Sequence, residues 1–512
     1  MRKIFSSIKG LSFIFGCLLL LSLVPALAND INANSVSYAP NWQNVPSRSV
    51  ADKLNDRLSA KDFGAKGDSI TDDTYAIQQA IYAVCNPAYT GSGGTVFFPS
   101  GVYVISSVIF PCNGVTLEGN NNGNTSSEQK DWRGTVFKLN TGDHKAAFAT
   151  GMTQSDYGSG IHISHASVDG TAMSPTATVF DFSWLQHSSI TDIATINISN
   201  LFREEGGAGN LIEDVSVMNL KGVGIEFFGD ASQCGTNNPS LLIADCHKRA
   251  DLLRVSRVSF NGVVKHIPNK DDIHYSTCFL YHDFAQSIII DHSVCEDAKY
   301  GILAYCSPIE GNNGEACPAY SRFHDFEAEN CTHCVEASDI QDWEFYDGYF
   351  LGQDQVSDHV VHIYSKNYGG AATTASIGSY AQAVRFHGGR FGNSGLSVLD
   401  MGIADFVIDG GQFFASNLRD QYNGIMSPNI EISANGSTTL PTRGIITGNI
   451  LCEASGQQIL MNENASFLKF VQGSIWLGSG VTNVKVFGNE YSRCASSPRD
   501  FNTYSSNVIA AF

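Results

Sequence analysis

Carboxylates and imidazoles with the potential for acid–base chemistry gather between residues 271 and 358 of this 512-residue chain. Glu336 and Asp358 are the leading pair. Two carboxylates that share a site push their pKa values apart, which leaves one protonated as an acid and one ionised as a base or nucleophile. His333 lies close enough in the sequence to orient or tune Glu336. Asp271 and Asp272 are rival catalytic carboxylates.

Side chains suited to holding a ligand flank these catalytic candidates. Asp271 and Asp272 lie on an unusually long connection, residues 263–275, which would overhang the same surface. Trp343 and Tyr346 are further aromatic groups that would stack on a flat ligand. The predicted binding residues are Glu226, His274, Tyr275, Lys299 and Tyr300.

A short repeated pattern must position these residues, because helical periodicity is almost absent after residue 85. An apolar residue is followed after two residues by a small or apolar residue, and after one more by another apolar residue. Some repeats are 22 residues apart, which is typical of a solenoid. The pattern begins at Ile163, Ile212, Val255, Ile290, Phe323, Phe345, Phe386, Ile408, Ile446 and Val486.

The two-residue gap indicates a tight turn between two strands, and a further strand-like segment follows each pair. Gly348, Gly389 and Gly411 occupy one slot of the pattern, which indicates close backbone packing. Three parallel strands per turn predict an all-β, single-stranded right-handed β-helix. A Greek-key sandwich would instead need hairpin turns between antiparallel strands. Aligning the third strands predicts a row containing Tyr300, His333 and Asp358.

The stretch "KDFGAKGDSITDDTYAIQQAI", residues 61–81, is acidic and rich in glycine, yet it lacks the endings of a phosphate-binding loop and of an EF-hand loop. Thr71 would cap a helix, and Asp72 and Asp73 would suit its dipole. Ala76, Ile77, Ala80, Ile81 and Val84 form one apolar face. This segment predicts an amphipathic helix laid over an apolar surface.

This stretch, together with "GGTVFFPSGVYVI" (93–105) and "GVTLEGN" (114–120), resembles the N-terminal signature of the pectate-lyase-like superfamily. The resemblance covers about residues 60–140 and is to the branch of rhamnogalacturonases, polygalacturonase-like hydrolases, uronan epimerases and tailspike depolymerases. It implies an N-terminal capping α-helix and a polysaccharide substrate. The hydrolase motifs Asn-Thr-Asp, Gly-Asp-Asp, Gly-His-Gly and Arg-Ile-Lys do not occur in register, and neither does the epimerase motif Asp-Pro-His. Catalytic residues therefore cannot be carried over from the family.

Glycoside hydrolysis by paired carboxylates is the leading expectation. A polysaccharide lyase or a uronan epimerase is the alternative, in which Lys299, Tyr300 or His333 removes a proton next to a uronate carboxylate. Hydrolysis requires no cofactor, whereas acidic groups would hold Ca²⁺ in a lyase. The third alternative is a non-catalytic carbohydrate-binding β-helix. The resemblance to tailspikes leaves a homotrimer open.

Residues 1–28 predict a cleaved signal peptide, with basic Arg2, Lys3 and Lys9 before an apolar core and an Ala-Leu-Ala site. We expect a secreted or periplasmic protein with no membrane contact after cleavage, an N-terminal extension at 29–59 and a β-helix at 60–512, with its capping segment at 60–120. Cleavage leaves 28 basic against 50 acidic residues, which argues against nucleic acid.

Cysteine usage also favours an oxidising compartment, because twelve of the thirteen cysteines lie after the signal segment. Four local disulfides are plausible from spacing. A lone Cys-x-x-Cys at Cys331 and Cys334 has no partner motif, so we expect no metal site there. The plausible disulfides are Cys85–Cys112, Cys234–Cys246, Cys306–Cys317 and Cys452–Cys494.

Overall fold

The computed structural model divides into two compact units, Met1–Leu58 and Ser59–Phe512. The strand β3 (Arg57–Ser59) crosses the boundary between them. The residues that the structure describes are 32–42, 44–85, 93–122, 134–141, 146–152, 157–229, 250–262, 277–283, 285–308, 315–353, 359–364, 383–414, 429–432, 443–453, 475–477, 481, 483–491 and 509–511.

The first unit contains little regular structure. A short 3₁₀ helix, η2 (Ala33–Ser35), precedes the antiparallel pair β1 (Ser37–Tyr38) and β2 (Arg48–Ser49), and the helix α2 (Val50–Leu54) follows. The Ser49 hydroxyl accepts the Asp52 backbone N–H, which caps α2. The predicted signal peptide, residues 1–28, lies outside the described residues.

The second unit opens with η3 (Ala60–Phe63), β4 (Asp68–Asp72) and the helix α3 (Thr74–Cys85). The predicted apolar face is largely confirmed, because Ile77, Ala80, Ile81 and Val84 are all buried. The predicted cap at Thr71 is wrong. The helix begins three residues later, and Asp72 accepts the Thr74 N–H and hydroxyl.

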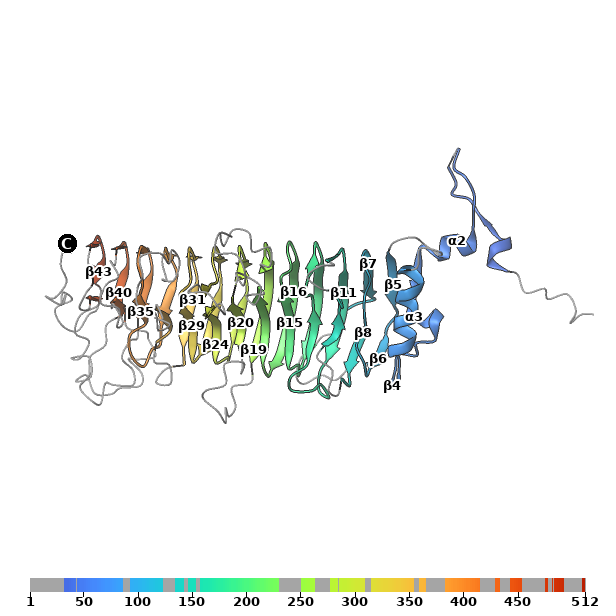
Figure 1. Ribbon diagram of the computed structural model, residues 1–512, viewed down its shortest axis with the longest axis horizontal. Helices are drawn as coiled ribbons and strands as arrows, with labels where there is room; N and C mark the ends of the chain where they lie inside the picture. The colour runs from blue at the N-terminus through green and yellow to red at the C-terminus, as the bar shows by residue number, and fades with distance from the viewer. Residues whose placement is uncertain are drawn as a thin grey trace, which may run out of the picture. The chain divides into compact units, whose positions relative to one another are not determined.

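The acidic residues of this opening stretch are committed to backbone donors. Asp73, only 1% exposed, accepts the backbone N–H groups of Lys66 and Gly67 at 2.6 and 3.1 Å. Asp68 accepts those of Ile70 and Thr71. Figure 1 shows α3 beside β4 and β5. These acids therefore fix the local chain path, as the sequence predicts, whereas closure of the β-helix core by α3 stays a prediction.

From β4 onward the chain winds as a parallel β-helix of stacked coils (Figure 1). The predicted fold class is confirmed. Most coils contribute first to one sheet, which we call sheet I. Its strands in this unit are β4, β5 (Gly94–Phe98), β6 (Gly101–Ile105), β7 (Val115–Gly119), β8 (Thr135–Leu139), β11 (His162–Asp169), β14 (Ser189–Ile196), β16 (Leu211–Leu220), β19 (Arg254–Gly262), β22 (Ile289–Asp291), β23 (Val294–Glu296), β27 (Arg322–His324), β28 (Glu327–Cys331), β30 (Glu344–Tyr346), β31 (Tyr349–Gly352), β33 (Arg385–His387), β34 (Arg390–Gly392), β36 (Phe406–Asp409), β37 (Gln412–Phe414), β39 (Gly444–Thr447), β40 (Ile450–Glu453), β42 (Val484–Phe487), β43 (Glu490–Tyr491) and β44 (Ile509–Ala511).

The coils then contribute to an eleven-stranded parallel sheet, which we call sheet II. Its order along the stack follows the chain. Its strands are β9 (Ala146–Ala149), β12 (Thr178–Asp181), β15 (Asn200–Glu205), β17 (Val223–Phe228), β20 (Thr277–His282), β24 (Tyr300–Tyr305), β29 (His333–Ser338), β32 (Val361–Tyr364), β35 (Leu399–Gly402), β38 (Ile430–Ile432) and β41 (Ile475–Leu477).

Three small pairings lie beside the two long sheets. The pairs β10 (Gly158–Ser159) with β13 (Leu185–Gln186) and β18 (Ala250–Asp251) with β21 (Ala285–Gln286) are parallel. The pair β25 (Ser307–Pro308) with β26 (Glu315–Ala316) is antiparallel.

The two-residue gap of the repeat is the turn that the sequence predicts. Its second residue has a positive φ in coil after coil, which places it in the left-handed region. Most earlier coils use Asp or His there, which tolerate this conformation better than branched residues do, and later coils use glycine. These residues are His165, Asp192, Asp214, Arg257, His292, Asp325, Asp347, Gly388, Gly410, Gly448 and Gly488.

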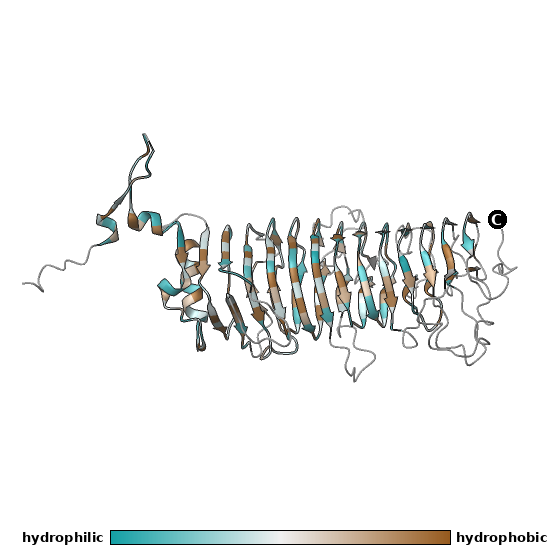
Figure 2. Cartoon of the chain, turned by 180° about the vertical axis from the view of Figure 1, so that it is seen from behind, coloured by the Kyte–Doolittle hydropathy of each residue, from teal (hydrophilic) through white to brown (hydrophobic). Residues whose placement is uncertain are grey.

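Aromatic and aliphatic side chains fill the inside of the coils, and Figure 2 shows hydrophobic and hydrophilic segments alternating along the strands. Phe345 stacks between Phe323 and Phe386 at centroid distances of 4.4 and 4.6 Å. Trp343 packs against Phe323 in this core and is 0% exposed. The prediction that Trp343 stacks on a ligand is therefore wrong, because the ring fills the core.

Replacing Gly389 with alanine should destabilise the fold by about 2–5 kcal/mol, because a positive φ adds strain to overpacking. A Cβ atom there would lie 2.5 Å from the Gly348 carbonyl oxygen on the preceding coil. Urea titration measures the loss. Gly151→Ala is the control for the positive φ, since its Cβ would meet only the Phe110 ring at 3.3 Å. Equal losses in both variants would contradict close packing as the larger cause.

Three disulfides link described residues. The predicted bonds Cys85–Cys112 and Cys306–Cys317 are confirmed, and Cys278–Cys295 was missed because its partners lie on different coils. Cys234, Cys246 and Cys494, from the other two predicted pairs, lie outside the described residues.

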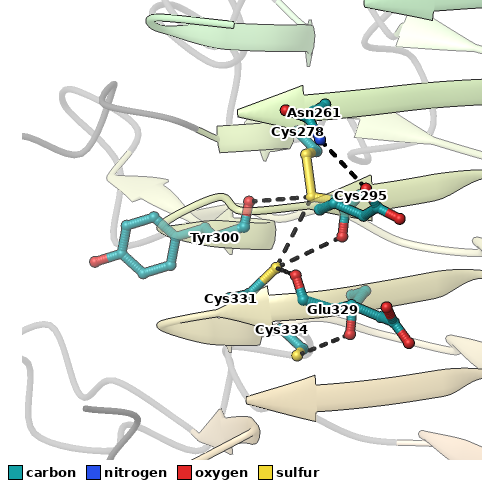
Figure 3. The surroundings of a disulfide bond; sticks show 9 residues. Asn261, Cys278, Cys295, Tyr300, Glu329, Cys331 and Cys334 are labelled. Atoms are coloured by element: carbon teal, nitrogen blue, oxygen red, sulfur yellow. Dashed lines mark hydrogen bonds between the residues drawn. A yellow bond between two sulfur atoms is a disulfide. The ribbon is translucent and has the colours of Figure 1, made fainter. Parts of the chain in front are cut away.

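The Cys-x-x-Cys residues lie in the core next to the missed disulfide (Figure 3). Cys331 Sγ lies 4.0 Å from Cys295 Sγ, and Cys334 donates to the Ala328 carbonyl at 3.3 Å. Burial raises the pKa of the Cys334 thiol. Both cysteines are buried, and neither belongs to the three disulfides that link described residues. Burial in the core favours the structural interpretation of this motif.

Candidate functional site

One row of side chains along sheet II brings titratable groups together, and we call it the outer row. It is set by the parallel register, in which Glu336 pairs with His362, His362 with Asp400 and Asp400 with Glu431. Towards the N-terminus the row continues through Leu303 and Leu280 to Glu226. Neighbouring positions are about 4.8 Å apart, as in any sheet.

The predicted alignment of this row is correct up to Glu336, and is then wrong by one residue on the next coil and by three residues on the coil after that. The sequence alignment placed Val361 and Ser397 after Glu336, whereas the register places His362 and Asp400 there. Val361 is 0% exposed because it points into the core. By the same register, His359 rather than Asp358 is level with His333.

Imidazoles and carboxylates alternate at the C-terminal part of the outer row. His362 Nδ1 lies 3.1 Å from both carboxylate oxygens of Glu336. His362 Nε2 lies 3.8 Å from Asp400 Oδ2, and His333 Nδ1 lies 3.6 Å from Glu336 Oε2. An imidazole that bridges two carboxylates can hold a proton and pass it on.

A second chain of contacts closes the group. His359 Nε2 lies 3.6 Å from Asp400 Oδ2, and His359 Nδ1 lies 2.9 Å from the Ser397 hydroxyl. The Ser397 hydroxyl donates to Glu431 Oε2 at 3.2 Å. We call His333, Glu336, His359, His362, Ser397, Asp400 and Glu431 the acid–base cluster.

Burial changes the acidity of this cluster. Burial, and then the charge of Asp400, raises the pKa of Glu431 to about 7, and burial also raises the pKa of Asp400. Burial alone would lower the pKa of His362, but the hydrogen bond to Glu336 and the neighbouring carboxylates outweigh it and raise that pKa. Burial and like charges therefore make Glu431 and Asp400 weaker acids than free carboxyl groups, and the neighbouring carboxylates favour the cationic form of His362.

One oxygen of the cluster has no hydrogen bond. Asp400 is 6% exposed, and its Oδ1 atom has no hydrogen-bond partner among the described residues. A buried polar atom without a partner is costly. Such an atom in a cluster of titratable groups is a natural point for a substrate hydroxyl or carboxyl group to bind.

Two predicted binding residues adjoin the cluster. Tyr300 pairs with His333 across the sheet, and their rings stack at 5.4 Å. Lys299 is 6% exposed, and its ammonium lies 4.9 Å from the centre of the Tyr300 ring. The predicted row of Tyr300 and His333 with Glu336 beside them is therefore present.

An apolar patch separates the acid–base cluster from the N-terminal part of the outer row. It consists of Val223, Leu280 and Leu303, with Tyr300 and Tyr305 packed against it. Its three aliphatic side chains are at most 6% exposed, so the patch is buried packing on the outer side of sheet II rather than a surface open to a ligand.

Glu226 belongs to a separate ion-pair network beyond this patch. Its carboxylate lies 3.5 Å from Arg203 Nε and 3.2 Å from His282 Nε2. Arg203 also contacts Asp181 at 3.4 Å and Glu205 at 3.5 Å. The predicted binding residue Glu226 therefore lies on the same outer row as Glu336 but does not join the acid–base cluster.

The remaining predicted site residues lie outside the described part of the chain. They are Asp271, Asp272, His274, Tyr275 and Asp358. Their roles stay predictions.

A similar His–Asp pair occurs away from sheet II. His387 Nδ1 lies 3.0 Å from Asp409 on sheet I, and Tyr346 stacks between His324 and His387. His324, His387 and Asp409 therefore lie on sheet I, away from the acid–base cluster. Tyr346 does not adjoin the acid–base cluster, contrary to its suggested ligand-stacking role.

Four groups of the acid–base cluster escaped the sequence prediction as site residues: His359, His362, Asp400 and Glu431. The sequence does contain a shared pattern on three of these coils. "HCVEA" (333–337), "HVVHI" (359–363) and "SVLDM" (397–401) share a polar first residue, two apolar residues, a polar residue and another apolar residue. Aligning on the buried pair would have placed Glu336, His362 and Asp400 in one row.

The described residues contain no group of three or more His, Cys, Asp or Glu side chains arranged to hold a metal ion. In the acid–base cluster His362 lies between Glu336 and Asp400, whereas Asp400 and Glu431 are direct register neighbours. Within the same described part of the chain, no helix has the length and apolar character needed to cross a membrane.

The β-helix and its N-terminal signature are similar to those of pectate-lyase-like proteins. Residues 58–263 match the family described as "Rhamnogalacturonase A/epimerase, pectate lyase-like". The resemblance stated from residues 60–140 is therefore confirmed over a longer part of the chain.

Two curated relatives match short stretches. Mannuronan C5-epimerase AlgE1 of Azotobacter vinelandii is 39% identical over 123 residues, which are 22% of this chain and 8% of the relative. Plasmin and fibronectin-binding protein A of Streptococcus pneumoniae is 47% identical over 53 residues, which are 10% of this chain and 7% of the relative. The chain thus matches less than a tenth of either relative's length.

A solved structure supports the fold over most of the chain. This chain is similar to the N-terminal fragment of gene product 12 of bacteriophage Phi29. The match covers 88% of this chain and 71% of the phage fragment, with a TM-score of 0.52 and 11% sequence identity. At this identity the likeness shows the fold alone.

Proposed function

We propose that this protein is an exported enzyme that acts on an acidic polysaccharide by removing the proton next to a uronate carboxylate. Return of a proton to the opposite face gives an epimerase, and loss of the neighbouring sugar oxygen gives a lyase. The observation that carries the proposal is the acid–base cluster, in which His362 lies between Glu336 and Asp400 and burial raises the pKa values of Asp400 and Glu431.

The main cost of this chemistry is the negative charge that develops on the substrate carboxylate when the adjacent proton leaves. A protonated carboxyl group can donate a hydrogen bond to that charge, and a preorganised cation stabilises it further. In our assignment Asp400 and Glu431 supply the hydrogen bonds, and His362 supplies the cation. His333, with Glu336 at 3.6 Å, is the base that takes the proton.

Substrate binding follows from the neighbouring surface. Tyr300, which is partly exposed and stacks on His333, would hold a sugar ring beside the acid–base cluster. The matched epimerase acts on mannuronan, which supports a polyuronate as the substrate class. The confirmed disulfides support an oxidising compartment and therefore export.

Glycoside hydrolysis is the second candidate function. Glu431, with a pKa raised to about 7, has the acidity of a general acid, and Glu336 or Asp400 would activate water. The relatives' activities favour proton removal over this alternative, which the sequence had ranked first. Non-catalytic binding is the third candidate, supported by the short match to a binding protein.

One incubation separates these functions. The purified protein is incubated in ²H₂O with mannuronan, with polygalacturonate and with a neutral glucan. Ultraviolet absorbance of an unsaturated uronate together with new reducing ends identifies a lyase. Deuterium at C5 without chain cleavage identifies an epimerase. Reducing ends alone identify a hydrolase. Binding with none of these signals would contradict an enzyme.

A further inference from the structure

Ser397 lies at the junction between two titratable groups of the acid–base cluster. It is 0% exposed, so it is not placed to touch a substrate. Its hydroxyl oxygen lies 2.9 Å from His359 Nδ1 and 3.2 Å from Glu431 Oε2. Its carbonyl accepts the Ser394 hydroxyl at 2.8 Å, which holds the backbone in place.

The hydrogens of this junction can be assigned from the acceptors. His359 Nδ1 also lies 3.3 Å from the Ser397 carbonyl oxygen, which can only accept. Nδ1 therefore carries a hydrogen and donates to Ser397, and the single hydroxyl hydrogen of Ser397 goes to Glu431. In neutral His359 the lone pair is then on Nε2, which faces Asp400 at 3.6 Å.

We propose that Ser397 is a positioning residue that sets the acidity of Glu431 and the tautomer of His359. The part played by this acidity in the reaction rests on the proposed function, whereas the effect of Ser397 on Glu431 does not. A hydrogen bond donated to a carboxylate stabilises its ionised form. Ser397 thus opposes burial and keeps the proton of Glu431 exchangeable. The fixed tautomer leaves His359 able to accept a proton only on the side of Asp400.

Ser397 is the neutral side chain next to Glu431 that changes its pKa. Among the described residues, Asp400 on β35 and His362 on β32 are the charged groups that act on Glu431. On the other side its register partner on β41 is Trp476, which does not titrate. Asp400 raises and His362 lowers the pKa of Glu431, and Ser397 lowers it through the hydrogen bond.

Ser397→Ala tests the proposal without any substrate. Carbon-13 NMR of protein labelled in its glutamate carboxyl groups follows the titration of Glu431, whose signal is identified by its loss in Glu431→Gln. We expect the midpoint to rise by about one pH unit in Ser397→Ala, because one hydrogen bond to the ionised form is lost. Ser397→Thr, which keeps the hydroxyl, should restore the wild-type midpoint.

Ser338→Ala is the matched control. Ser338 is a buried serine on sheet II whose hydroxyl has no hydrogen-bond partner among the described residues. Its loss should leave the Glu431 midpoint unchanged. An unchanged midpoint in Ser397→Ala would overturn the proposal, and so would an equal shift in Ser338→Ala.

The activity readout separates this proposal from the proposed function. If protonated Glu431 is the active form, activity falls as Glu431 ionises, and Ser397→Ala should move that fall to higher pH by the same amount as the NMR midpoint. A shifted midpoint in a protein inactive on every polymer would support the positioning role and overturn the proposed function. A shifted midpoint with an unmoved activity profile would overturn the part assigned to Glu431 in the reaction.

Discussion

Replacing Asp400 with asparagine should lower kcat on a polyuronate by about 10²–10⁴-fold, the usual contribution of a positioned acid or base. The change keeps the size of the side chain but removes its exchangeable proton. Asp400 lies within 3.6 and 3.8 Å of His359 and His362, so both imidazoles lose their shared carboxylate. KM should change much less than kcat, because the interaction is used in the transition state.

Asp409→Asn is the control for this prediction. Asp409 makes a comparable contact, 3.0 Å to His387, but it lies on sheet I. Its replacement should leave kcat within about threefold of wild type and cost little stability, as for an exposed ion pair. Initial rates and unfolding curves of the two variants measure these effects on kcat and on stability. Equal rates for wild type and Asp400→Asn would remove the acid–base cluster from the reaction.

The free energy of unfolding should fall by about 4 kcal/mol between pH 4.5 and 8, because of Glu204 alone. This residue is 0% exposed, and burial raises its pKa from the ordinary value of 4.5 to about 8. Between these values the folded chain holds a proton that the unfolded chain has released. The stabilisation is therefore complete below pH 4.5 and is lost as the pH rises through the folded pKa.

Glu204→Gln should remove most of this pH dependence. Asn210 donates to one oxygen of Glu204 at 3.2 Å, and the other oxygen has no hydrogen-bond partner among the described residues. A neutral amide therefore replaces a group that burial already keeps protonated. Urea unfolding at about pH 5 and about pH 9 measures the difference. The outward neighbour supplies the control variant Glu205→Gln, which should keep the wild-type slope.

The fold could be predicted because its signal is repeated. Apolar positions recur in coil after coil, and each recurrence restates the same inward-facing pattern. Even the turn residue follows a rule, since Asp, His and glycine tolerate a positive φ. The predicted helix was also found, although its cap lies at Asp72 rather than Thr71, because the backbone of residues 68–72 first forms a strand.

The site could be predicted only as far as the register was known. Glu336, His333 and Tyr300 lie on successive coils of constant pattern, so the alignment placed them correctly. At β32 the alignment slipped by one residue, which selected the buried Val361 in place of His362. At β35 it was three residues off and selected Ser397 in place of Asp400. Contacts between coils, such as Cys278–Cys295, also depend on register and cannot be read from local spacing.

The outer row also places its side chains at fixed distances from one another. Six register steps separate Glu226 from Glu431, so the two ends of the row lie roughly 29 Å apart at the ordinary strand spacing. Hydrogen bonds between neighbouring coils fix the spacing of these positions. One side chain of the row can therefore be substituted without moving the others. A polymer lying along this row would meet the ion-pair network at one end and the acid–base cluster at the other, at a fixed separation. Substituting one position of the outer row at a time would then change which sugar unit of the polymer is recognised, without changing the reaction performed on it.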